Sequence, residues 1–156
     1  MATTPTINQF NVLFKDIATK HEMINDYGFG PTYNINNEVI KYPFLWVEPM
    51  NSTLTGTPTT GFLTETYQFV LIVMDKINKG DDNYIQTSSD SDYILKTILS
   101  LLDTNPLYVD MGLGIGGDVI CEPVYEQTED YSNGWQATIT LKVPMRFNPC
   151  NSPTSY

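Results

Sequence analysis

The amino-acid sequence predicts an α+β fold: a mainly antiparallel sheet of about four strands, with two helices packed on one face and a long β-arm loop between the first two strands. Apolar residues recur with helical spacing in two segments, and period-two alternation marks four others, at 42–49, 66–75, 118–126 and 135–143. A chain of 156 residues can bury a single core. We therefore expect one α+β domain over residues 1–147, followed by an extended or flexible tail at 148–156.

The first helix is predicted at residues 7–24, where Thr4 or Thr6 can cap its start. Its apolar face is formed by residues spaced near i, i+3, i+4 and i+7: Ile7, Phe10, Leu13, Phe14, Ile17, Ala18 and Ile24. The turn-rich stretch 26–41 ends it. His21 lies on the polar flank of this helix without a second ligand or nucleophile nearby, so we expect a structural role for it.

The segment TYQFVLIVMD, residues 66–75, is the strand around which we expect the sheet to be built. One of its faces carries Tyr67, Phe69, Leu71 and Val73, which the chain's own helices can cover. The other face begins polar and then becomes apolar, at Val70, Ile72 and Met74. This apolar half needs a second cover, from a loop, a sheet or another subunit.

Residues 50–62, MNSTLTGTPTTGF, separate this strand from the one at 42–49. They are rich in Thr and Gly and have few apolar anchors. Structureless loops of this length are uncommon in compact domains unless they are functional or disordered. Two interpretations stay open, a flexible β-arm that reaches a neighbouring molecule and a mobile surface loop.

The second helix has an apolar face made by Ile94, Leu95, Ile98, Leu99, Leu101 and Leu102. Ser89 or Ser91 can cap its start, and Pro106 follows its end. In the closing hairpin, we expect Asn133 and Gly134 in the turn before a strand whose odd-numbered positions from 135 to 143 are apolar. Pro123 indicates that its partner is an edge or bulged strand.

Composition and motifs argue against several functional classes. The net charge of −10 disfavours tight binding to phosphate backbones. The glycines at 112, 114 and 117 match a dinucleotide fingerprint in spacing, but a strand pattern follows them where a helix is required. Cys121 and Cys150 are too few for a disulfide framework.

The acidic residues do not form a recognisable catalytic or metal motif. Those at 81, 82, 90 and 92 do not match the spacing of the twelve-residue calcium loop. Glu122, Glu126, Glu129 and Asp130 are close in sequence without any sign of a cleft. We assign no catalytic, cofactor-binding or metal-binding residue and no cofactor, and we do not expect an enzyme. If there were one, the loop 81–92 or the segment 122–130 would be its site.

The order helix, strand, long loop, strand, helix and two strands resembles that of the tail-terminator and head–tail joining ring proteins of tailed bacteriophages. The segments that carry the resemblance are NQFNVLFKDIATKH, YPFLWVEP, TYQFVLIVMDK, SDYILKTILSLLD and WQATITLKVPMRF. The Asn- and Thr-rich texture is similar to that of crAss-like phages. The resemblance implies a structural virion protein, assembled in the host cytoplasm, that forms a ring of six subunits, or of a multiple of six, around the DNA channel at the neck or tail end. Its partners would be further copies and other tail or neck proteins. Genomic DNA would pass without specific binding, and no membrane would be involved.

The candidate interface residues come from the predicted arm, the second sheet face and an aromatic loop. They are Met50, Leu54, Pro58, Phe62, Val70, Ile72, Met74 and Tyr131. The alternative function is a non-catalytic virion or surface binding module, such as an adhesin-like or fibre-attachment domain, whose loop tyrosines contact a partner.

Overall fold

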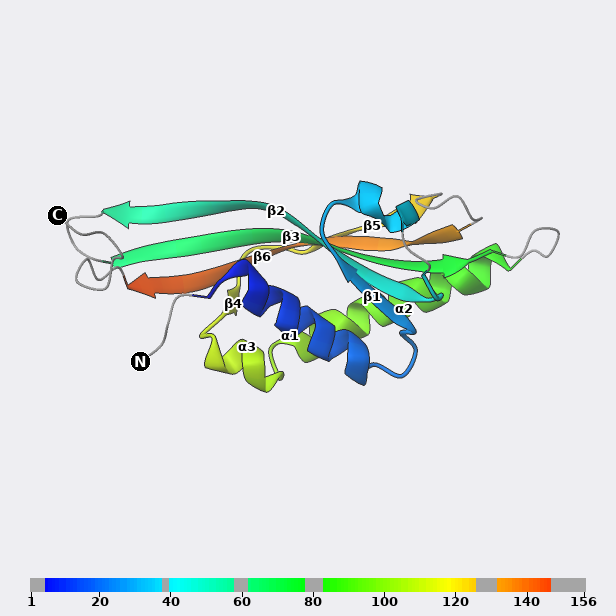
Figure 1. Ribbon diagram of the computed structural model, residues 1–156, viewed down its shortest axis with the longest axis horizontal. Coiled ribbons are helices and arrows are strands. Elements are labelled where there is room, and N and C mark those ends of the chain that lie inside the picture. The colour runs from blue at the N-terminus through cyan, green and yellow to red at the C-terminus, as the bar shows by residue number, and fades with distance from the viewer. Residues whose placement is uncertain (1–4, 38–39, 58–61, 78–82, 126–131, 147–156) are drawn as a thin grey trace.

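The computed structural model describes residues 5–37, 40–57, 62–77, 83–125 and 132–146. These residues form a mixed six-stranded sheet in the order β1-β2-β3-β6-β4, with β5 also pairing with β6 (Figure 1). Three helices, α1 (Ile7–Lys20), α2 (Tyr84–Leu102) and α3 (Pro106–Asp110), accompany the sheet. The α+β class is therefore confirmed. The expectation of about four mainly antiparallel strands and two helices is wrong in detail.

The missed strands are short. β1 (Asp26–Phe29) pairs in parallel with the start of β2 (Phe44–Thr57), and β4 (Gly114–Ile115) is a two-residue strand beside β6 (Ser132–Arg146). β1 contains Gly28, which the sequence presents as a turn residue. Trp46 lies directly opposite, and a Cβ atom on Gly28 would overlap its indole ring. Close packing, not a turn, requires this glycine.

β2 and β3 (Phe62–Lys76) form one long antiparallel hairpin that runs from Phe44 opposite Met74 to Thr57 opposite Phe62. The expected loop over residues 50–62 is therefore wrong for residues 50–57 and for Phe62, which are strand. The register shifts once, between Pro49 and Asn51, where the extra residue forms a bulge. The β-branched threonines of this segment suit the extended conformation.

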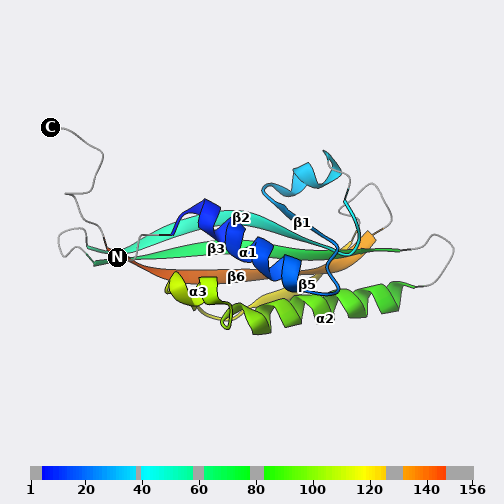
Figure 2. The same cartoon turned by 60° about the horizontal axis from the view of Figure 1, so that its bottom comes forward.

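The main core lies between the helices and one face of the sheet (Figure 2). As predicted, Phe69, Leu71 and Val73 are buried on this face, and Tyr67 packs at its margin. Phe69 contacts the rings of two α1 residues, with ring centroids 5.0 Å from Phe10 and 5.4 Å from Phe14. The odd-numbered positions of β6 from Ala137 to Val143 are buried on the same face.

A second, smaller core covers the apolar half of the other sheet face. It contains Phe44 and Trp46 from β2, the three apolar β3 residues 70, 72 and 74, and Val124 from β5 (Ile120–Tyr125). Ile35, from the 3-10 helix η1 (Thr32–Asn37), is buried among them, and Ile40 and Tyr42 pack against them. The sequence left open whether a loop, a sheet or another subunit covers this apolar half of the sheet. In the structure, a loop of the same chain covers it.

α1 starts as predicted, at Ile7 after Thr6, whereas its end and the start of α2 differ from their predicted positions. Thr6 is the N-cap of α1, and its backbone N–H donates to Gln9 Oε1 at 2.7 Å. α1 ends at Lys20 instead of residue 24, and α2 begins at Tyr84, after Asn83, instead of at Ser89 or Ser91. β5, which contains Pro123, pairs only with β6 among the described strands, so the predicted edge strand is confirmed.

Candidate functional site

The sheet continues beyond the helices at one end of the molecule as a three-stranded extension (Figure 1). We call this extension the arm and define it as residues 50–57 of β2, 62–66 of β3 and 142–146 of β6. Thr57 lies opposite Phe62, and Phe62 lies opposite Arg146, so the three strands reach the same end. Residues 50–56 are all exposed. The arm is therefore the largest extended surface that the described chain leaves uncovered on β2.

The candidate interface residues fall into three groups. Met50 and Leu54 lie on the arm and are 55% and 56% exposed. Val70, Ile72 and Met74 are buried in the second core, so this part of the predicted interface is not exposed, because the loop that carries Ile35 covers it. Phe62 begins β3 in the arm. Pro58 and Tyr131 lie outside the described residues.

The arm has two chemically different faces, which follow from the alternation of the strands and their register. Its outer face, on the side of the second core, carries Asn51, Thr53, Thr55, Thr64 and Thr66, together with the exposed Lys142, which lies opposite Thr66. Gln68, Thr138 and Thr140 continue this polar face toward the second core. Asn51 Nδ2 donates to Gln68 Oε1 at 3.1 Å across the β2–β3 pair.

On the helix-side face of the arm, Leu54 lies opposite Glu65, a buried carboxyl group. Desolvation, together with a hydrogen bond to Glu65, raises the pKa of Tyr67 to about 12. The Tyr67 hydroxyl is therefore protonated at neutral pH and acts as a hydrogen-bond donor, not as a base.

The outer edge of β2 is open along the arm. β1 pairs with β2 only as far as Phe29 opposite Val47, and no other described strand lies on that side of β2. The opposite edge of the sheet is better covered, because β5 pairs with residues 133–138 of β6 and β4 with Leu141 and Lys142. Sequence analysis did not find this edge, since it placed residues 50–57 outside the strands.

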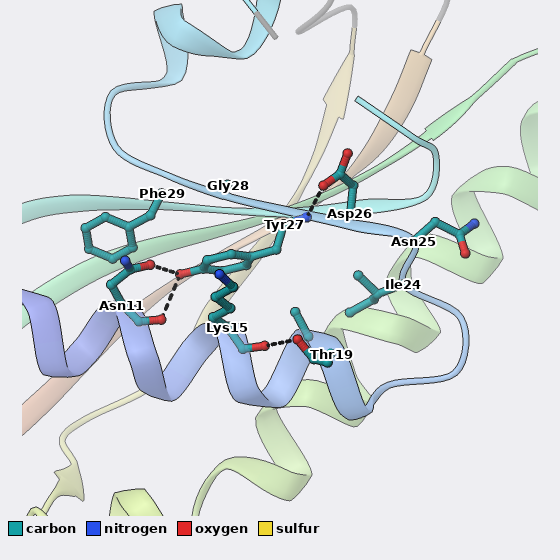
Figure 3. Close-up of a pocket in the computed structure, with 10 residues that line it drawn as sticks. Asn11, Lys15, Thr19, Ile24, Asn25, Asp26, Tyr27, Gly28 and Phe29 are labelled. Atoms are coloured by element: carbon teal, nitrogen blue, oxygen red, sulfur yellow. Dashed lines mark hydrogen bonds between the residues drawn. The ribbon is translucent and has the colours of Figure 1, made fainter. Parts of the chain in front are cut away.

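A groove with a volume of about 640 Å³ lies between α1 and β1 (Figure 3). The Tyr27 hydroxyl contacts Asn11 Oδ1 at 2.9 Å and the Asn11 carbonyl oxygen at 3.3 Å, and burial raises the Tyr27 pKa above its usual range. Asp26 accepts from the backbone N–H groups of Tyr27 and Lys41 at 2.9 and 3.1 Å. The polar groups of the groove thus hold β1 and its neighbours in place. Sequence analysis missed the groove, because its β1 side falls in the stretch assigned to turns.

The acidic residues considered as a catalytic or metal site make local structural contacts, as far as the structure describes them. Asp90 and Asp92 lie within α2, not in a loop, where they accept from Gln86 and Lys96 at 2.8 and 2.7 Å. Glu122 accepts from Gln136 Nε2 at 3.2 Å. Within the described residues, no three His, Cys, Asp or Glu side chains are grouped so that they could hold a metal ion. Asp81, Asp82 and the segment 126–130 lie outside these residues.

Cys121 is half-buried, and burial raises the pKa of its thiol. The thiol form therefore predominates at neutral pH, which lowers its reactivity as a nucleophile.

Comparison with known proteins gives no family assignment. No protein-family model matches this chain, and no curated protein matches it. None of the described helices has the length and apolar character needed to cross a bilayer.

Proposed function

We propose that this chain is a structural subunit of a tailed-bacteriophage virion, which associates head to tail into a ring around the DNA channel at the neck or tail end. The observation that supports this proposal best is the arm. Its strands extend past the helices, and residues 50–56 are exposed along their whole length. A long extension that the helices of its own chain do not cover is expected where neighbouring molecules supply the missing contacts.

The element order adds support. The first helix, the long hairpin, the second helix and the closing β5–β6 pair follow the order on which the resemblance to ring proteins rests. Ring closure needs a heterologous interface, in which one surface of a copy meets a different surface of the next. Met50 and Leu54 are the apolar arm residues available for such an interface.

The surface chemistry is compatible with a DNA channel. Of the described side chains on the outer face of the arm, all but Lys142 are neutral and polar, and the whole chain carries a net charge of −10. Tight binding to DNA depends on cationic side chains that displace counterions from the phosphates. A channel formed by such subunits lets DNA pass without adhering to the wall.

The proposal is tested by measuring the mass of the purified full-length protein with light scattering and native mass spectrometry, and by electron microscopy of the particles. We expect closed particles of several chains. Leu54→Asp should reduce the fraction of chains in these particles, because it places a carboxylate in the arm contact. The matched control is Ile120→Asp, at a 63% exposed position on β5 away from the arm. Single chains that do not assemble in the free protein or in virion particles would overturn the proposal.

A further inference from the structure

We infer that the open edge of β2 is a strand-pairing site for the same edge of a second copy, so that two chains join across a two-fold axis into one continuous sheet. This inference goes beyond the proposed ring, whose closure needs a heterologous contact. The open stretch runs from Glu48 to Thr57, because β1 ends opposite Val47 and no further described strand pairs there. No described strand takes up its backbone N–H and C=O groups on that side, so they can bond an added strand.

Beyond Pro49, and as far as the described residues show, this edge lacks the devices that usually prevent edge pairing. Such devices are charged side chains, prolines, short strands and coverage by another segment. After Pro49, the stretch contains no proline up to Thr57, and no charged residue occurs from Met50 to Thr64. The single bulge lies at the beginning of the stretch, between Pro49 and Asn51. The β6 edge differs, because β4 and β5 pair along it, and Pro144 and Arg146 stand in the remaining part.

The uncharged and self-complementary pattern of this stretch favours a second copy as the occupant. Any two copies repel each other overall, since each carries a net charge of −10. Residues 50–57 are the part of the open β2 edge where two acidic chains can approach without placing like charges side by side. The pattern is also self-complementary, because antiparallel pairing of the stretch with itself places Asn and Thr on one face of both strands.

The length of the open stretch sets the register. Its midpoint lies between Ser52 and Thr53, and pairing about Thr53 joins residues 49–57 and leaves Glu48 outside the overlap. This register places Thr53 opposite Thr53 and Asn51 opposite Thr55 of the second copy. Cross-strand Thr–Thr pairs are among the favourable pairs of antiparallel sheets. The row of polar residues on the outer face would then continue across the axis, and Leu54 would lie beside Ser52 of the second copy on the helix-side face.

A cysteine cross-linking experiment tests the contact directly. In full-length protein with Cys121→Ser and Cys150→Ser, Thr53→Cys should form a disulfide-linked dimer on mild oxidation, because facing residues of an antiparallel pair can be bridged. The matched control is Thr66→Cys, since Thr66 lies opposite Thr53 on the next strand inward and on the same face. It should stay monomeric on a non-reducing gel. A Thr53→Cys protein that cross-links no more than Thr66→Cys would overturn the inference.

A charge variant provides an independent test in the otherwise unchanged chain. Thr55→Glu places two carboxylates close to the two-fold contact and should weaken association at least tenfold, as measured by sedimentation. Thr64→Glu is the control, because Thr64 is exposed, lies opposite Thr55 on the same face and belongs to the inner strand. Circular dichroism checks that both variants fold. If Thr55→Glu does not fold, the cross-linking experiment alone decides whether the edge contact exists.

The two proposals fail in different ways. If Thr55→Glu leaves the mass and stability of closed particles unchanged, the edge contact is refuted while the ring remains. If the Thr53→Cys protein cross-links, while wild-type protein forms only dimers and no larger particle appears in virions, the ring is refuted while the edge contact remains. If both hold, the combined symmetry is dihedral, and the number of chains in each particle is even.

Discussion

At the scale of single residues, His21 shows how the end of α1 sets the chemistry of one side chain. Its backbone N–H donates to the Ala18 carbonyl oxygen at 3.3 Å, and its Nδ1 accepts from the Met23 N–H at 3.2 Å. Nε2 is buried without a hydrogen-bond partner among the described residues. Burial lowers the His21 pKa, and the nearby Glu22 carboxylate opposes this effect only in part. The neutral imidazole therefore fits this site better than the cation.

We expect the His21 pKa in the folded protein to lie below its ordinary value of 6.5. As pH falls below that value, the unfolded chain binds the proton first, so this residue's contribution to stability is complete above pH 6.5 and is lost toward the lower folded-state pKa. Proton NMR measures the pKa without an assignment problem, because the chain has one histidine. His21→Gln should flatten the stability profile in this window. A measured pKa at or above 6.5 would contradict the prediction.

At the scale of elements, Asn105 connects two helices that are distant in sequence. Its Oδ1 accepts from the Leu107 N–H at 2.9 Å and caps α3, while its Nδ2 donates to Asp16 Oδ2 of α1 at 2.9 Å. Asp16 also accepts from Lys20 Nζ at 2.9 Å. The hydrogen bond from Asn105, followed by that from Lys20, lowers the Asp16 pKa. The side-chain amide of Asn105 thus caps the start of α3 and also links α3 to α1.

Replacing Asn105 by Ala should lower the free energy of unfolding by about 1–2 kcal/mol, because both the cap and the link to α1 are lost. Urea denaturation at pH 7 measures the change. Thr104→Ala serves as the control, since Thr104 is exposed and its hydroxyl donates only to the Leu101 carbonyl oxygen at 2.8 Å. We expect that control to change stability by less than about 0.5 kcal/mol. Equal effects of the two substitutions would show that the Asn105 contacts do not matter.

Sequence patterns predicted the elements whose burial is one-sided. The strand from Trp135 to Val143 and the two main helices carry regular apolar spacing, since each buries one face on the main core. β1 could not be predicted, because its pairing depends on Trp46 packing over Gly28, a contact between distant residues. The arm strands were missed for a different reason. A stretch of Thr, Asn and Gly has no apolar alternation, and its strand structure comes from pairing with β3.

At the scale of the whole molecule, two separate cores cover the sheet. The second core was the less predictable one, because Ile35 and Ile40 stand in a turn-rich segment that gives no periodic signal. For this reason Val70, Ile72 and Met74 were expected to face another subunit, although the chain buries them itself. Met50 and Leu54 could be predicted as exposed, since no other apolar side chain accompanies them in residues 50–57 of β2.

Self-association of this acidic chain should strengthen with ionic strength. Charge repulsion between copies acts over roughly 30 Å at 0.01 M salt and roughly 8 Å at 0.15 M. Each copy carries a net charge of −10, while the residues at the open β2 edge beyond Pro49 are uncharged, so screening removes repulsion without weakening the contact. Sedimentation at the two salt concentrations measures the dissociation constant. Weaker association at the higher salt would indicate an interface of opposite charges.

The two tryptophans lie on opposite sides of the sheet, with consequences for spectroscopy. Trp46 is buried in the second core, and its indole N–H donates to the Gly30 carbonyl oxygen at 2.8 Å. Trp135 is half-buried against the main core, and its indole N–H donates to Ser88 Oγ at 3.0 Å. Each ring is thus an intrinsic fluorophore for one layer. Replacing one tryptophan by Phe leaves the other as the only tryptophan in the chain, and its emission wavelength follows the unfolding of its own core. Comparison of the two variants during denaturation shows whether the second core unfolds before the main core.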